Sequence, residues 1–168
     1  MCNYFGFLEE SINEGYGLRS VIFFSGCKHN CFNCHMPKSH DFNYGKPLDE
    51  ENTHKIIKTM KENILLDGLT LCGGDPFFVA KDALEFTRKV KKELPHFDIW
   101  SYTGFTYEEI LNSNDNDMIN LLKEIDVLID GRFVEKLKDL TLKFRGSRNQ
   151  RMIDVKKSLE LNKVIEIE

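Results

Sequence analysis

Three cysteines stand close together in this sequence, at a spacing that suits metal binding. Cys27, Cys31 and Cys34 form the pattern C-x3-C-x2-C. The apolar run that precedes them, residues 21–24, is β-branched and aromatic and predicts a buried strand that ends at residues 25–26. Because the three thiols follow one strand end on one short loop, they can converge on a single metal centre.

The number of cysteines points to the kind of metal. A structural zinc site and an ordinary iron–sulfur cluster each take four protein ligands. Three cysteines on a 4Fe-4S cluster leave one iron open, which is what a cluster needs to bind a substrate. The alternative is a zinc knuckle completed by His29, His35 or Cys72. A histidine beside a metal ligand is more often a hydrogen-bonding neighbour than a ligand itself.

A second motif, Gly73-Gly74-Asp75-Pro76, ends the next predicted strand. Two glycines let the backbone approach a ligand closely and direct its carbonyl groups at a cation. Taken alone, the motif is also compatible with a plain turn between a strand and a helix. Its place about 40 residues after the cysteine loop favours a functional role.

The elements that must position these residues alternate along the chain. We expect strands at residues 3–8, 21–24, 69–72, 97–102, 126–130 and 164–167, and helices at 48–62, 80–94, 107–111, 117–124 and 153–161. Alternating strands and helices predict an α/β fold with parallel strands, whose chemistry lies at the carboxyl ends of the strands. The cysteine loop and residues 73–75, 101–104 and 130–132 all follow predicted strand ends. Residues 132–151 are expected to be irregular.

Length, charge and cysteine count narrow the class of protein. The 168 residues predict a single domain, 1–168, shorter than the roughly 250 residues of a complete eight-fold barrel. A net charge of −4 gives no basic surface, so we expect no nucleic acid partner. No apolar run approaches the roughly 20 residues that span a bilayer, and no signal peptide is evident, so we expect no membrane association. Five cysteines, an odd number, favour a reducing, cytoplasmic location.

Together the two motifs resemble the signature of the radical S-adenosylmethionine (SAM) superfamily, in which the second motif reads G-G-E-P. The resemblance implies an open, partial (βα) barrel with mostly parallel strands. It implies that Cys27, Cys31 and Cys34 hold a 4Fe-4S cluster and that the carbonyl groups of Gly73 and Gly74 hold the amino group of SAM. Asp75 stands in the place of the motif's glutamate, one methylene shorter.

Longer stretches resemble the activating enzymes of anaerobic (class III) ribonucleotide reductase. These are residues 15–20, 26–27, 100–104, 126–133 (containing D-G-R-F) and 144–151 (F-R-G-S-R-N-Q-R). The resemblance implies reductive cleavage of SAM and installation of a glycyl radical on the reductase large subunit. It also implies an electron donor such as flavodoxin or ferredoxin, and allows a homodimer. Activation of another glycyl-radical enzyme and a non-catalytic zinc-binding interaction module are the alternatives.

The resemblance also suggests roles for residues at later strand ends. Ser101 and Asp130 stand where related activases contact SAM or a cation, although Asp130 could equally cap a turn before Gly131. The position just before the third cysteine, often aromatic in the superfamily, is Asn33, so adenine packing is unassigned. We expect the polar, basic stretch 145–151 to face the protein partner, although its composition also fits a solvated loop.

Overall fold

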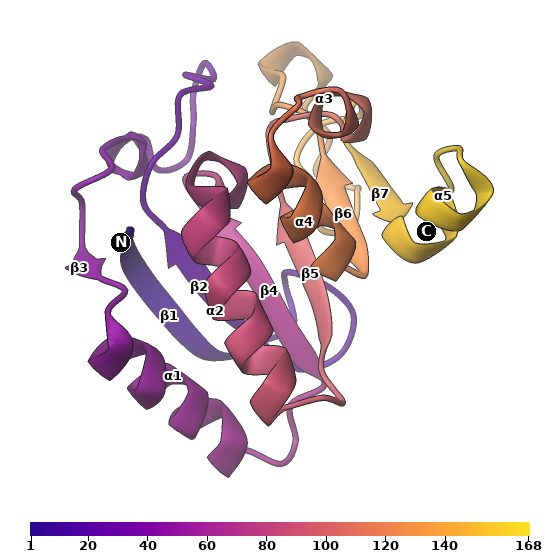
Figure 1. The fold of residues 1–168 in the computed structure, drawn as a ribbon. Coiled ribbons are helices and arrows are strands. Elements are labelled where there is room, and N and C mark those ends of the chain that lie inside the picture. Colours follow the sequence, from indigo (N-terminus) through magenta and orange to yellow (C-terminus); the bar gives the residue numbers. More distant parts are fainter.

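The structure is a computed structural model that describes residues 1–168 as one seven-stranded sheet with five α-helices (Figure 1). The strands are β1 (Asn3–Ser11), β2 (Arg19–Phe24), β3 (Lys46–Pro47), β4 (Gly68–Gly73), β5 (Asp98–Tyr102), β6 (Val127–Asp130) and β7 (Arg151–Asp154). The helices are α1 (Glu50–Glu62), α2 (Ala80–Glu93), α3 (Tyr107–Leu111), α4 (Asn116–Glu124) and α5 (Val155–Leu161). None of them has both the length and the apolar character required to span a bilayer.

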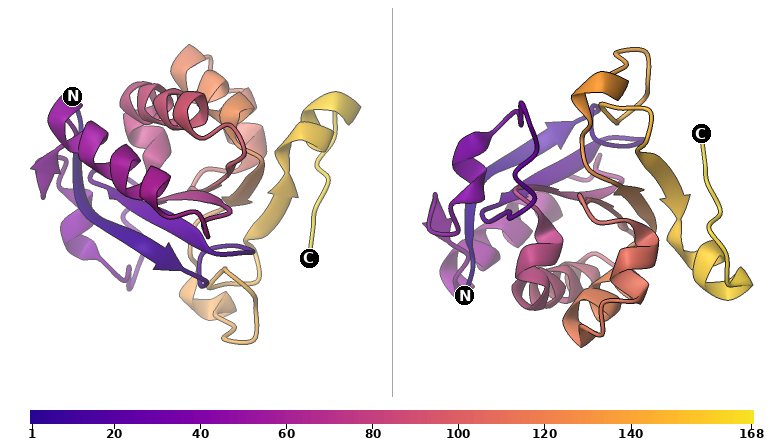
Figure 2. Two further views of the ribbon diagram at one scale, coloured as in Figure 1. Left: turned by 90° about the horizontal axis from the view of Figure 1, so that it is seen from below. Right: turned by 90° about the horizontal axis from the view of Figure 1, so that it is seen from above.

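The sheet has a parallel centre and antiparallel edges. Its strand order is β3-β1-β2-β4-β5-β6-β7, and β2, β4, β5 and β6 pair in parallel. Antiparallel pairing adds β1 and β3 on one side and β7 on the other. The N-terminal and C-terminal segments lie at opposite sides of the sheet, so the sheet is open (Figure 2). The predicted α/β class with mostly parallel strands is confirmed.

The sequence-based assignment was wrong at the C-terminal end of the chain. Residues 164–167 form no strand, and only an isolated bridge joins Glu166 to Ile153. The edge strand is instead β7, which begins in the segment expected to be irregular, and α5 begins at Val155 rather than at residue 153. The reason is tertiary pairing. Met152 and Ile153 are buried against β6, and the Asp154 carboxylate caps α5 by accepting from the Lys157 amide.

Helices cover one face of the sheet and enclose the main hydrophobic core. In Figure 1, α2 and α4 lie in front of the strands. The core gathers 27 buried residues, including Ile22, Leu71 and Ile99 from the strands and Leu84 and Val90 from α2. Side chains alternate along a strand. The remaining strand residues therefore point to the opposite face, which is called the inner face below.

A buried arginine organises the inner face at the amino ends of the parallel strands. The Arg19 side chain is 1% exposed, and its guanidinium donates to Asp98 Oδ1 at 2.7 Å and to Thr70 Oγ1 at 2.8 Å. It also donates to the carbonyl groups of Tyr16, Leu69 and Asp98. Every guanidinium nitrogen therefore has an acceptor, which is the condition for burying such a charge without a large penalty.

Aromatic rings from two distant loops close the inner face above this arginine. The Arg19 guanidinium lies 5.3 Å from the centre of the Trp100 ring. Tyr16 and Phe144 meet Trp100 edge-on at 5.7 and 5.6 Å. Gly15 lies against the same indole, where a Cβ would come within 2.9 Å of the ring. The glycine-rich turn before β2 thus packs beneath the loop that carries residues 144–151.

We predict that Arg19→Met lowers the free energy of unfolding by about 2–4 kcal/mol, because it strands Asp98 and three carbonyl groups. Urea denaturation of the metal-free protein measures this change. Arg88→Met is the matched control, since its ion pair with Glu124 is more than half exposed on the arginine side. That control should change stability by about 0–1 kcal/mol. Equal effects of the two substitutions would contradict the organising role of Arg19.

Candidate metal and cofactor site

The cysteine loop begins directly after β2 and turns through unusual backbone conformations. Gly26 has φ +112°, and its amide donates to the Ser39 carbonyl at 2.7 Å. Asn30 and Asn33 adopt positive φ values of 53° and 56°. Asparagine is among the few residues that tolerate this left-handed region. The geometry thus accounts for an asparagine at position 33, immediately before the third cysteine.

All three cysteines line one cavity of about 240 Å³ at the carboxyl ends of the parallel strands. All five cysteines of the chain are free thiols. Gly73 and Gly74 line the cavity from the end of β4, and Cys72 and Tyr102 line it from the inner face. No three His, Cys, Asp or Glu side chains are placed to hold a single metal ion. The three cysteines share one cavity, as a cluster with three cysteine ligands requires.

Cys27 and Cys31 lie in an environment that favours the protonated form of their thiols when no metal is present. Burial raises the pKa of Cys27 to about 11. Burial, followed by the neighbouring Cys34, raises the pKa of Cys31, whereas the Phe133 amide and Arg132 act in the opposite direction. Thiolates are the metal ligands. Binding of a cationic metal centre must therefore displace these protons.

The two glycines are required for the close packing of the second motif against the cysteine loop. Gly73 has φ +110°, and a Cβ there would come within 2.3 Å of the Phe24 amide nitrogen. A Cβ on Gly74 would come within 2.6 Å of the Gly26 carbonyl oxygen. The Gly74 amide donates to the Phe24 carbonyl at 2.7 Å. The backbone of the glycine motif is thus fixed directly beside the entry to the cysteine loop.

The Asp75 carboxylate is buried and accepts four hydrogen bonds. Oδ1 accepts from the Phe77 amide at 2.9 Å. Oδ2 accepts from His29 Nε2 at 2.7 Å, from Thr103 Oγ1 at 3.0 Å and from the Gly104 amide at 2.8 Å. Asp75, which stands in the place of the motif's glutamate, is not among the residues that line the cavity, and its carboxylate joins the loops after β2, β4 and β5.

His29, treated in the sequence as a hydrogen-bonding neighbour of the cluster ligands, contacts the loops after β4, β5 and β6. Its side chain is 3% exposed and lies between the rings of Phe78 and Phe105, at centroid distances of 4.8 and 4.6 Å. Besides donating to Asp75, it accepts from Arg132 Nε at 3.2 Å. The only sequence signal for these contacts was the position of His29 between two cysteines, in C-x-H-x-C. That pattern does not indicate which residues His29 would contact.

The structure separates Ser101 and Asp130 from the cavity of the cysteines. Ser101 is fully buried and shares its row in the sheet with Leu71 and Leu128 of the main core. The Asp130 carboxylate accepts from the Tyr107 amide at 2.8 Å, at the start of α3, and pairs with Arg151. Asp130 thus accepts a hydrogen bond from the first residue of α3, whereas the sequence had suggested a cap of the turn before Gly131.

The stretch 145–151 was expected to face a protein partner, and several of its polar side chains make hydrogen bonds within the chain. Arg151 pairs with Asp130 at 2.6 Å and with Glu108 at 2.7 Å. Gln150 Nε2 donates to the Gly131 carbonyl at 3.0 Å, and Asn149 Nδ2 donates to the Arg132 carbonyl at 2.7 Å. Residues 149–151 therefore hold residues 130–132 in place, while Asn149 remains exposed at the surface.

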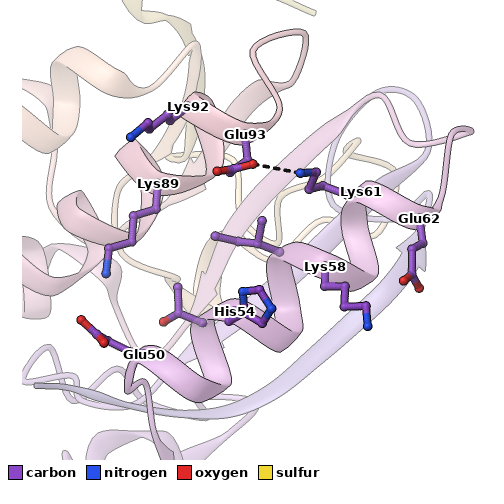
Figure 3. Close-up of a pocket in the computed structure, with 10 residues that line it drawn as sticks. Glu50, His54, Lys58, Lys61, Glu62, Lys89, Lys92 and Glu93 are labelled. Carbon is purple, nitrogen blue, oxygen red and sulfur yellow. Dashed lines mark hydrogen bonds and ion pairs between the residues drawn. The ribbon is translucent and has the colours of Figure 1, made fainter.

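A larger groove of about 530 Å³ lies between α1 and α2, away from the cysteines (Figure 3). Ten residues line it, among them His54, four lysines and three glutamates. Its charged side chains are all exposed, and Lys61 is paired with Glu93 at 2.9 Å. The groove contains no thiol, and its one buried polar side chain is the hydroxyl of Thr53, so we assign it no role in metal chemistry.

Comparison with known proteins agrees with the geometry of the cysteine cavity. Residues 13–153 match a family described as a 4Fe-4S single cluster domain. The anaerobic ribonucleoside-triphosphate reductase-activating protein of Pasteurella multocida is 40% identical over 151 residues, or 88% of this chain and 94% of that protein. Its counterparts from Haemophilus influenzae and Escherichia coli K12 are 38% and 36% identical, over 95% and 96% of their own lengths. The chain therefore belongs to the family of anaerobic ribonucleoside-triphosphate reductase-activating proteins with a 4Fe-4S cluster domain.

Proposed function

We propose that this protein installs a glycyl radical on an anaerobic ribonucleotide reductase, using a 4Fe-4S cluster held by Cys27, Cys31 and Cys34 and SAM held beside it. The observation that carries the proposal is the single cavity that three free thiols share with two glycine backbones. When bound there, the cluster would supply the electron that cleaves SAM to methionine and a 5′-deoxyadenosyl radical. The family assignment supports the reductase as the partner.

The chain's own residues would bind and orient these groups. Three thiolates would ligate three irons and leave the fourth open to SAM. Gly73 and Gly74, whose backbone is fixed beside Gly26, would present carbonyl groups to the amino group of SAM. Cys72 and Tyr102 would close the inner side of the cavity and keep water away from it.

We also infer that the open sheet is a partial (βα) barrel of the radical SAM type. Support comes from four adjacent parallel strands, from helices on one face and from the position of the cavity at the carboxyl strand ends. An open sheet leaves lateral access to the cavity. Such access suits a polypeptide segment of a partner better than it suits a closed site for a small metabolite.

The cluster assignment predicts distinct effects of cysteine substitution. Protein reconstituted without oxygen should be brown and hold about four irons with sulfide per chain. Cys27→Ala, Cys31→Ala and Cys34→Ala should each lose the cluster, because each removes one of only three ligands. Cys2→Ala, at a core position outside the cavity, is the control and should retain it. Stoichiometric zinc without sulfide would favour the zinc-binding module instead.

A second experiment tests the reaction itself. With a strong one-electron reductant and SAM, the reconstituted protein should form methionine and 5′-deoxyadenosine in equal amounts, measured by chromatography. In the presence of an anaerobic reductase it should produce the electron paramagnetic resonance doublet of a glycyl radical. If the protein cleaves SAM but forms no radical on the reductase, and instead forms a glycyl radical on another glycyl-radical enzyme, that other enzyme is its target.

Arg145 is the residue of the stretch 145–151 that the structure leaves with an unused donor. Its Nε is buried without a hydrogen-bond partner. It lines a pocket of about 330 Å³ together with Phe133, Phe144 and Gly146. This pocket adjoins the cysteine cavity, because His35, Tyr102, Phe133 and Gln150 line both. We infer that Arg145 donates to a backbone carbonyl of the partner segment that carries the glycine.

Arg145→Met should leave reductive SAM cleavage within about twofold of the original rate and lower glycyl-radical formation at least tenfold, a loss of about 1.4 kcal/mol. The two product assays described above separate these steps. Arg148→Met is the matched control, because Arg148 is exposed and lines neither pocket. Parallel loss of both activities would instead place Arg145 in the SAM site.

A further inference from the structure

The cysteine loop has little backbone support of its own. None of the backbone amides or carbonyl groups of residues 28–33 is hydrogen-bonded to another segment. The Cys34 amide bonds within the loop, to the Cys31 carbonyl at 3.3 Å, and the Cys27 amide makes a long 3.5 Å contact with the His40 carbonyl. Something other than the backbone must therefore hold the middle of the loop.

The His29 side chain supplies that support, and its hydrogen bonds have a fixed polarity. Arginine can only donate, so Arg132 Nε requires His29 Nδ1 to be the acceptor. Nε2 then carries the hydrogen and donates to the Asp75 carboxylate at 2.7 Å. The Asp75 oxygen that receives it also accepts from Thr103 and Gly104, so an acceptor at His29 could not replace the donor.

Packing around the imidazole is as specific as its hydrogen bonds. Phe78 and Phe105 lie against the ring. Gly104 lies so close that a Cβ there would come within 2.4 Å of the imidazole carbon Cδ2. Arg132 is held in turn through its carbonyl group by Asn149. The imidazole therefore meets groups from the loops after β4, β5 and β6.

We propose that His29 is a positioning residue that locks the cysteine loop onto the loops after β4, β5 and β6. The lock sets the three thiols opposite Gly73 and Gly74 before any metal binds. The expected benefit for cluster and SAM binding rests on the proposed function. The attachment of the cysteine loop by His29 does not require a metal, so it is tested in the metal-free protein.

The test is amide hydrogen exchange of residues 27–36 in the reduced, metal-free protein, followed by mass spectrometry. His29→Phe preserves a ring between Phe78 and Phe105 but removes both hydrogen bonds, and should accelerate exchange in this segment at least tenfold. His29→Gln keeps one donor and one acceptor and should restore much of the protection. His54→Phe, at an exposed position on α1, is the control and should change nothing in the segment.

Arg132→Leu provides a second variant whose folding is not at risk, because the Arg132 side chain is exposed. It removes only the donor to Nδ1 and should accelerate exchange less than His29→Phe does. Unchanged exchange in His29→Phe would overturn the proposal. Equal acceleration in His29→Gln and His29→Phe would overturn the claim that the hydrogen bonds of His29 hold the loop.

A spectroscopic measurement on the reconstituted protein links the lock to the site. The electron paramagnetic resonance signal of the reduced cluster should change on addition of SAM in the original protein. In His29→Phe that change should need at least tenfold more SAM. If the loop of the original protein is protected from exchange but SAM does not change the signal, the proposed function is contradicted. The role of His29 in holding the loop would still stand.

Discussion

The candidate site depends on one buried carboxylate, that of Asp75. A carboxylate without partners would be costly at 1% exposure, so its burial requires several donors. Those donors come from the cysteine loop, from the loop after β5 and from the turn that Asp75 itself begins. Satisfying this one group therefore fixes the relative positions of three loops that have few backbone contacts with one another.

The family-specific sequence stretches act together in the structure. The segment 130–132 is held by residues 149–151 through side chains that continue the pairing of β6 with β7. The turn at residues 15–19 and the loop at Phe144 both pack on Trp100 beneath the cavity. Motifs far apart in the sequence thus form two supports, one beside the cysteine loop and one below the cavity. Polar side chains of residues 149–151 make hydrogen bonds within the first of these supports.

The thiols connect this rigid frame to metal chemistry. Burial raises the pKa values of Cys27 and Cys31, which favours the neutral form of these two thiols when no metal is bound. The charge of a metal centre is needed to bring them to the thiolate form. A loop already held in place loses less conformational entropy when it binds a cluster. Preorganisation by neighbouring loops and deprotonation by the metal are therefore complementary requirements of such a site.

The sequence alone determined the α/β class, the order of most strands and helices, and the grouping of Cys27, Cys31 and Cys34 near the glycine motif. These features follow from local patterns, because hydrophobic periodicity and closely spaced ligands need no distant partner. The tertiary structure decided the rest. It placed β7 at residues 151–154, where the end of an irregular segment and the start of a helix were expected, because pairing with β6 outweighs the weak local signal of four residues. It also assigned Asp75, Asp130 and Arg151 to structural bonds, because the donors and acceptors that satisfy a buried charge come from residues distant in the chain.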